Sequence, residues 1–259
     1  MGKFIVIDGL DGSGKETQAN LLARHLTEKG MKVRVISFPM YESESSHLVK
    51  MYLGGALGSR PEDTNAYAAS SFYAADRYIS YRTDWKKDID DPGTVVIANR
   101  FTTANAVHQL SKMPREYWDE FLAWLWDYEY ERLGVPRPDL VLYLEMTPAI
   151  SMALVNSRSQ ETGRKKDIHE LDPRHLENSY DAAMYSSDKL GWTRVRCYRD
   201  GAPRPIEEIG QEILSEAEKI LCALEERGVL LKKHPCTPKT LKRGFIMDGS
   251  STENIKNNG

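Results

Sequence analysis

The chain reads Gly9-Leu-Asp-Gly-Ser-Gly-Lys15 directly after the apolar run Phe4-Ile5-Val6-Ile7 and directly before a segment of helical periodicity. In this strand, loop and helix context, the pattern G-x-x-x-x-G-K forms a phosphate-binding loop. Its glycines let backbone amides point at phosphate oxygens, the helix N-terminus adds positive potential, and Lys15 supplies a cation. We predict a nucleoside triphosphate site at this loop. The alternative is a glycine-rich turn that binds nothing.

Outward from this loop, apolar runs rich in β-branched residues alternate with longer segments of helical period. Such alternation is typical of βαβ units and of a parallel sheet covered on both faces. We therefore predict an α/β protein with a three-layer P-loop NTPase fold, in which a five-stranded parallel sheet is flanked by helices. The expected strands are Lys3 to Asp8, Lys32 to Phe38, Thr94 to Ala98, Leu140 to Glu145, and Thr193 to Tyr198.

The helices are predicted from apolar residues that recur at a period of 3.6. In the first helix these residues are Ala19, Leu22, Ala23 and Leu26, and Gly30 is suited to end it. The other expected helices are His47 to Leu57, Asp63 to Trp85, Pro114 to Leu133, Pro148 to Asn156, Arg174 to Leu190, and Ile206 to Arg227.

Two segments depart from this pattern. Residues 157–172 (SRSQETGRKKDIHELD) are polar, with little apolar material to pack on a sheet, and they predict a flexible lid. From Gly228 onward the chain has no period and ends in a polar stretch, which we expect to be partly disordered. The predicted organisation is a P-loop nucleotide-binding domain over 1–227, with its lid at about 157–172, and a C-terminal extension over 228–259.

The overall composition narrows the function class. The chain has 35 basic and 38 acidic residues and a net charge of −3, which lacks the basic excess of most nucleic-acid binders. Its three cysteines are scattered, with no CxxC motif and no His/Cys cluster to suggest structural zinc. The sequence shows no signal peptide and no apolar run of membrane-spanning length. We expect a cytoplasmic protein without membrane or nucleic-acid partners.

Several short motifs follow the loop in a recognisable order. The N-terminal motif is Asp8-Gly-Leu-Asp-Gly-Ser-Gly-Lys-Glu-Thr-Gln18, and the later ones are Phe38-Pro-Met-Tyr41, Tyr73-Ala-Ala-Asp-Arg77 and Asn99-Arg-Phe101. In order and spacing this set resembles the thymidylate kinases over roughly residues 3 to 220. The resemblance implies transfer of the γ-phosphoryl group of ATP, with Mg²⁺, to dTMP to give dTDP, by an enzyme that commonly forms homodimers.

The resemblance also implies roles for individual residues. The expected ATP-binding residues are Gly9, Asp11, Gly12, Ser13, Gly14, Lys15, Glu16 and Thr17. The expected acceptor-binding residues are Asp11, Phe38, Tyr41, Tyr73, Arg77, Arg100 and Asn105. In the family, the two arginines hold the acceptor monophosphate, which suits the forked guanidinium group. The alternatives are surface ion pairs for the arginines and a core position for the tyrosine at 73.

The sequence leaves the roles of several further residues on the acceptor side undecided. An amide at Asn105 offers the donor and acceptor that a pyrimidine edge needs. Tyr180 or Tyr185 is expected to close the site from the far side, without a choice between them. His108 and Gln109 could reach the sugar or base, or simply form a partly exposed helix end.

Two residues depart from the family pattern. Glu16 stands where the motif has a Ser or Thr that ligates magnesium, and Asn99 stands where the family has an Asp. A carboxylate can ligate magnesium. We therefore take Glu16 as the candidate metal ligand and hypothesise that Glu16 and Asn99 compensate for one another.

The loop itself holds Gly12 and Ser13 where some family members have an arginine. The missing charge is expected from the lid, which offers Arg158, Arg164, Lys165 and Lys166. A closing lid excludes water and brings cations to the transferring group. The candidate catalytic residues are Lys15, Arg100 and Arg164, although the choice among the lid cations stays open.

Two other functions fit the same residues. One is a kinase for another monophosphate, such as a 5-substituted deoxyuridylate, because the arginines do not distinguish it from dTMP. The other is a nucleotide-binding regulatory protein with an impaired metal site, which the glutamate at 16 and the asparagine at 99 would favour.

Overall fold

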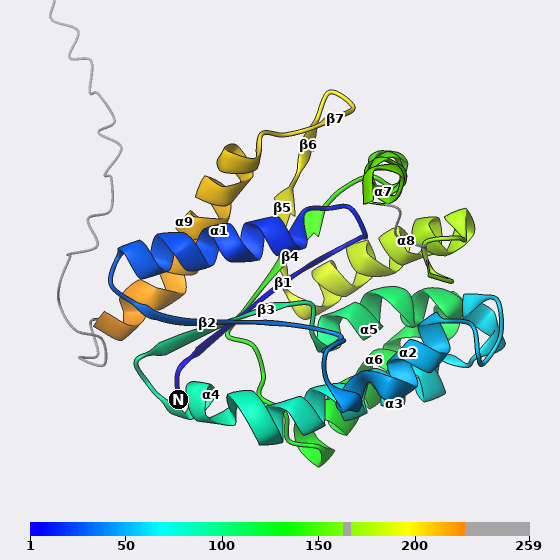
Figure 1. Cartoon of the computed structure of the whole chain (residues 1–259), viewed down its shortest axis with the longest axis horizontal. Helices are drawn as coiled ribbons and strands as arrows, with labels where there is room; N and C mark the ends of the chain where they lie inside the picture. The colour runs from blue at the N-terminus through cyan, green and yellow to red at the C-terminus, as the bar shows by residue number, and fades with distance from the viewer. Residues whose placement is uncertain (163–166, 226–259) are drawn as a thin grey trace, which may run out of the picture.

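The computed structural model describes residues 1–162 and 167–225. A parallel sheet of five strands lies at the centre, in the order β2-β3-β1-β4-β5 (Figure 1). The strands are β1 (Lys3–Gly9), β2 (Lys32–Ser37), β3 (Thr94–Asn99), β4 (Leu140–Glu145) and β5 (Thr193–Arg196). All five predicted strands are present, and the α/β fold class is confirmed. The largest error is at β5, which ends at Arg196 instead of Tyr198.

Side chains of the central strand alternate between two hydrophobic cores. Ile5 and Ile7 of β1 pack with the core that contains the first and last helices, whereas Phe4 and Val6 pack with the core on the opposite face. Because successive side chains of a strand point to opposite faces, a strand covered on both sides is apolar throughout. The continuous apolar run therefore predicted the buried position of β1 correctly.

The helices cover both faces of this sheet (Figure 1). Helices α1 (Lys15–Glu28) and α9 (Ile206–Glu225) pack on one face. The other face is covered mainly by α3 (Ala66–Ser80), α4 (Lys86–Asp90), α5 (Thr102–His108), α6 (Trp118–Trp126) and α8 (Pro173–Leu190). Two further helices are α2 (His47–Leu53) and α7 (Pro148–Thr162). The chain also forms two π-helical turns, η3 (Tyr81–Trp85) and η6 (Asp127–Arg132), and a hairpin of β6 (Tyr198–Arg199) and β7 (Ala202–Pro203).

Several sequence-based boundaries are wrong. Helix α2 ends at Leu53, before two glycines, and the predicted helix from Asp63 starts at Ala66, where the Asn65 side chain caps it. The hairpin of β6 and β7 was not predicted. Helix α5 was also missed, because its sequence Thr-Thr-Ala-Asn-Ala-Val-His is short, contains β-branched residues and is buried on nearly all sides, so it shows no helical period.

The expected lid contains more order than its polar sequence suggested. Residues up to Thr162 continue α7, and Ile168 and His169 are buried. The first part of the predicted lid is therefore helical, and two of its later residues are buried although the segment has little apolar material. Arg164, Lys165, Lys166 and the predicted extension over 228–259 lie outside the described residues. Within the described part of the chain, no helix is both long enough and apolar enough to cross a membrane.

A buried ion pair ties the acceptor-side helices together. Arg77 of α3 donates from Nε to Glu129 Oε2 at 2.6 Å and from Nη2 to Glu129 Oε1, and both side chains are at most 1% exposed. Glu129 lies in η6 and also accepts from Thr102 Oγ1 at 2.8 Å and from Asn105 Nδ2 at 3.3 Å. One carboxylate thus joins α3, α5 and η6.

We predict that Glu129→Ala lowers the free energy of unfolding by about 3–5 kcal/mol, because it leaves the guanidinium of Arg77 buried without its partner. Equilibrium denaturation measures this loss. The matched control is Asp90→Ala, which removes an exposed pair with Lys86 and is expected to cost less than about 1 kcal/mol. Equal losses for the two variants would contradict the assignment.

Candidate active site

The carboxyl ends of the central strands lie side by side. In the parallel register, Ile7 of β1 pairs with Asn99 of β3, and Gly9 pairs with Leu144 of β4. The loops that follow β1 and β3 therefore leave the sheet at the same edge, where open α/β sheets bind their ligands.

A cleft of about 730 Å³ opens at this edge, a size suited to a small-molecule ligand. It is lined by the phosphate loop, by the segments after β2 and β3, by α3 and by the end of the lid segment. The sequence-predicted residues that line it are Asp11, Gly12, Gly14, Lys15, Glu16, Thr17, Phe38, Tyr41, Tyr73, Arg77, Asn99, Arg100, Asn105, His108, Gln109 and Arg158. Gly9 and Ser13 are not among the lining residues, and Arg164 lies outside the described chain.

The phosphate loop depends on two glycines with left-handed backbone. Gly14 caps α1 at φ 84°, and Gly12 has φ 78°. A Cβ on Gly12 would also lie 2.8 Å from the carbonyl oxygen of Ser151 in α7. Any side chain at Gly12 would thus be strained by its backbone and by α7, which explains why the loop needs glycine there.

Lys15 is folded back onto its own loop. Its Nζ donates to the carbonyl oxygens of Gly9 at 2.9 Å and of Leu10 at 2.7 Å. Burial and the nearby Arg100 lower the pKa of Lys15 to about 7, although Asp11 and Asp8 oppose the shift. The neutral amine of Lys15 is therefore populated near pH 7, and it gains a proton when an anion enters the cleft.

Arg100 links the phosphate loop to the acceptor side. Its Nη2 pairs with Asp11 Oδ1, and its Nη1 lies 2.9 Å from Nε2 of His108. Burial raises the pKa of Asp11, but the charges of Arg100 and Lys15 outweigh it and hold the pKa well below its usual range. Asp11 is thus anionic and occupies Arg100 in the absence of a ligand.

The backbone of Arg100 has φ 67°, in the left-handed region that non-glycine residues rarely adopt. Such a conformation costs roughly 1–2 kcal/mol, and strain of this kind is concentrated at functional sites. The strained residue is the one that lies between Asp11 and His108, which supports a functional role for it.

The far end of the cleft is aromatic and amide-rich. Phe38 is buried and Tyr41 is half exposed, while Tyr73 packs edge-on against Tyr52 with ring centroids 6.3 Å apart. Asn105 is buried beside Ser70 and Glu129. A flat ring and a fixed amide at one end of a cleft are suited to a planar base.

Arg77 lines the cleft and is paired with a buried carboxylate. Its Nε and Nη2 are held by Glu129, and its Nη1 contacts the carbonyl of Phe101 at 3.3 Å. The expectation that it grips the acceptor phosphate together with Arg100 stays a prediction. A guanidinium that is already neutralised also suits a neutral acceptor atom near Asn105.

The residues at positions 16 and 99 fit a magnesium ion. Glu16 and Asn99 line the same cleft, and Oδ1 of Asn99 is buried without a hydrogen-bond partner among the described residues. Carboxylate and amide oxygens are ligands that magnesium accepts. Glu16 is exposed and lies 3.6 Å from Nη2 of Arg158, so its carboxylate is within reach of the cleft.

The lid segment contributes residues that the sequence analysis did not single out. Asp167, His169 and Glu170 line the cleft, as does the predicted lid cation Arg158. Burial, and then Asp11, raise the pKa of Asp167 to about 6. The sequence signals for this placement were Ile168 and Leu171, two apolar residues within a polar stretch, of which only Ile168 is buried.

The two tyrosines that were expected to close the site take no part in the described cleft. Tyr185 donates to Asp119 at the surface and packs on Trp118, and Tyr180, also in α8, is partly buried against the hydrophobic core. Neither is among the residues that line the cleft.

Comparison with known proteins agrees with this geometry. The family model for thymidylate kinase matches residues 7–189. A "Probable thymidylate kinase" of Thermococcus gammatolerans is 34% identical over 69% of this chain and 81% of its own length. A thymidylate kinase of Mycobacterium tuberculosis is 28% identical over 73% of this chain and 87% of its own, and one of Danio rerio is 21% identical over 88% and 95%. The chain belongs to the thymidylate kinase family.

Proposed function

We propose that the chain transfers the γ-phosphoryl group of ATP to dTMP, giving dTDP. The observation that carries this proposal is a single cleft whose lining includes the phosphate loop with Lys15 and Arg100, and also the aromatic and amide side chains of Tyr73 and Asn105. In-line transfer needs both phosphates held together and their charge neutralised, and little else from the protein. The acceptor phosphate is already anionic, so no general base is required.

The charged residues would change partners when substrates bind. Arg100 would leave Asp11 for the acceptor phosphate, and Lys15 would leave the carbonyl oxygens of Gly9 and Leu10 for the phosphates of ATP. Each exchange replaces one charge-assisted contact with another. At the far end, Tyr73 would stack on the base while Asn105 and Arg77 contact its edge.

Magnesium bound to ATP would neutralise the phosphate oxygens during transfer. Glu16 and Asn99 would hold it, because both line the cleft and Oδ1 of Asn99 has no hydrogen-bond partner among the described residues. Arg158 is positioned to withdraw from Glu16 toward the phosphates, and the contribution of Arg164 stays a prediction from the sequence. A homodimer and a cytoplasmic location also stay predictions.

With ATP and magnesium, a panel of dTMP, dUMP, dCMP, dGMP and thymidine tests the acceptor. We expect dTMP to have the highest kcat/KM, and thymidine to be inactive because it lacks the phosphate that Arg100 would hold. A coupled assay for ADP measures each rate. If another monophosphate has a higher kcat/KM, that monophosphate replaces dTMP as the proposed substrate. Nucleotide binding without turnover would favour a regulatory protein.

Glu16→Gln tests the metal ligand. We expect kcat to fall by about tenfold or more, while ATP affinity measured without magnesium changes by less than about threefold, since only the metal contact is weakened. Glu28→Gln, an exposed substitution at the other end of α1, is the matched control. If the Glu16 variant keeps the wild-type kcat, the hypothesis that Glu16 and Asn99 compensate for one another is wrong.

The lowered pKa of Lys15 predicts proton uptake on ATP binding. At pH 8 a lysine with a pKa of about 7 is mostly neutral, and polyphosphate raises that pKa, so binding takes up close to one proton. Affinity should therefore fall as pH rises above about 7. Calorimetry in buffers of different ionisation enthalpy measures the uptake, which Lys15→Arg should abolish because arginine does not titrate in this range. If the wild-type protein takes up no proton when ATP binds, the pKa of Lys15 is not lowered.

A further inference from the structure

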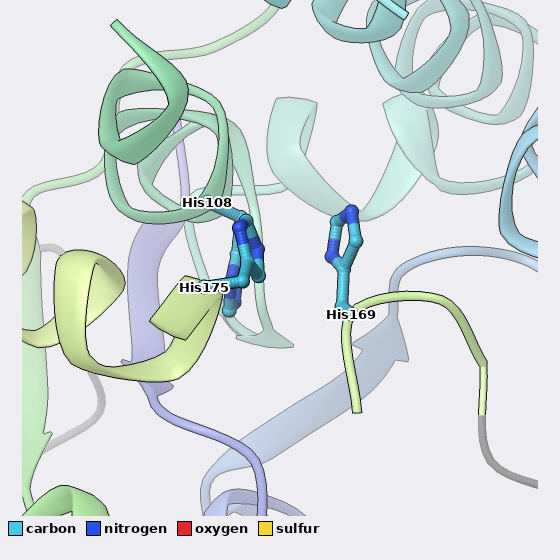
Figure 2. A group of neighbouring side chains, drawn as sticks. All are labelled: His108, His169 and His175. Atoms are coloured by element: carbon cyan, nitrogen blue, oxygen red, sulfur yellow. The ribbon is translucent and has the colours of Figure 1, made fainter. Parts of the chain in front are cut away.

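Three histidines from separate segments meet behind the phosphate loop (Figure 2). His108 ends α5, His169 lies in the turn before α8, and His175 lies in the first turn of α8, which the side chain of Asp172 caps. All three are buried, and one ring nitrogen of each lies within 4.8 Å of the other two. Nothing in the sequence motifs accounts for this cluster.

The cluster surrounds a small cavity of about 20 Å³, which is room for one ion or one water molecule. The three rings line it together with Asp11, Glu170 and Asp172. Zinc–nitrogen bonds of about 2.0–2.1 Å require tetrahedral nitrogens roughly 3.4 Å apart, so the rings would need to close by about 1 Å or slightly more. Side-chain rotation supplies movements of this size.

The three imidazoles are uncharged, which is the state that binds a metal. Burial lowers the pKa of all three, that of His175 to about 4, with a further contribution from Lys112 at His169 and His175. The rings are therefore neutral at pH 7. His175 is 2% exposed, and its Nε2 is buried with no hydrogen-bond partner in the described chain. An unpaired buried nitrogen is costly unless a ligand satisfies it.

Nearby groups complete the requirements of a metal site. The hydroxyl of Tyr52 lies 2.8 Å from Nε2 of His169 and can accept a hydrogen bond from Nε2–H, which would leave the lone pair of Nδ1 for the metal. Arg100 and Lys112 oppose a cation here, whereas Asp11, Glu170 and Asp172 favour one. Three imidazoles select zinc or a similar transition ion over magnesium.

We propose that His108, His169 and His175 form a binding site for a zinc-class divalent ion, with a fourth position open to the cavity. This site is separate from the magnesium position at Glu16 and Asn99. It would tie the lid-side turn of His169 to α5 and α8.

The site is coupled to the active site through His108. A neutral imidazole has one lone pair, and Arg100 donates a hydrogen bond to it at Nε2. A metal on either nitrogen of His108 must therefore displace Arg100, since Nε2 is then either ligated or protonated. By thermodynamic linkage, any anion that draws Arg100 away from His108 should raise the affinity for the metal. The metal should raise the affinity for that anion by the same factor. This coupling, unlike the metal site, rests on the proposed role of Arg100.

The test titrates metal-free full-length protein with Co²⁺ as a spectroscopic probe and then with Zn²⁺. We expect one equivalent of Co²⁺ with the strong visible absorption of four-coordinate cobalt, displaced by one equivalent of Zn²⁺ and unaffected by Mg²⁺. His169→Ala and His175→Ala should each weaken binding by at least about tenfold. His47→Ala, which removes an exposed histidine of α2, should leave it unchanged.

Circular dichroism and ATP binding show whether each variant is folded, and His175→Gln replaces His175→Ala if the latter is not. Absence of the cobalt spectrum, or binding that both cluster variants leave unchanged, overturns the proposal. Added dTMP, and separately Arg100→Met, test the coupling, and each should tighten Co²⁺ binding. If neither does while the cluster variants still lose the metal, the site stands and the coupling through Arg100 fails.

Discussion

The parallel pairing of β1 between β3 and β4 is the constraint on which the site depends. Because Ile7 is level with Asn99 and Gly9 with Leu144, the phosphate loop and Arg100 emerge at one edge of the sheet. The full burial of β1 enforces this register, since a slip would place polar loop residues in the two hydrophobic cores. Lys15, Asp11 and Arg100 come together as a consequence.

At that edge the protein holds its cations with groups that substrates can replace. Lys15 is held by two carbonyl oxygens of the loop, and Arg100 is held by Asp11. Both cations line the cleft and are not fixed within the hydrophobic core. Arg77 is different, because Glu129, Thr102 and Asn105 form a buried network around it. Two arginines that look equivalent in the sequence therefore have different surroundings: Arg100 is held by a single carboxylate and a histidine at the cleft, whereas Arg77 belongs to a buried network of side chains.

The histidine cluster adds a second layer behind this site. His108 contacts Arg100 on one side and faces His169 and His175 on the other, so it joins the acceptor side of the cleft to the lid-side turn. A group placed between two sites in this way transmits the occupancy of one to the other through a single lone pair. The arrangement needs no large movement of the fold.

Local patterns were sufficient for the five strands, the phosphate loop and the family. Apolar runs and glycine spacing reflect interactions between neighbours in the chain, and these are present in the sequence. Helix α5, the partner of Arg77 and the histidine cluster were not predictable in this way. Glu129 is far from Arg77 in sequence, and the three histidines come from α5, the lid-side turn and α8. Their contacts form only because the sheet and its covering helices bring these segments together. Once buried, a polar group either has a hydrogen-bond partner, as Arg77 has in Glu129, or is left without one, as Nε2 of His175 is among the described residues.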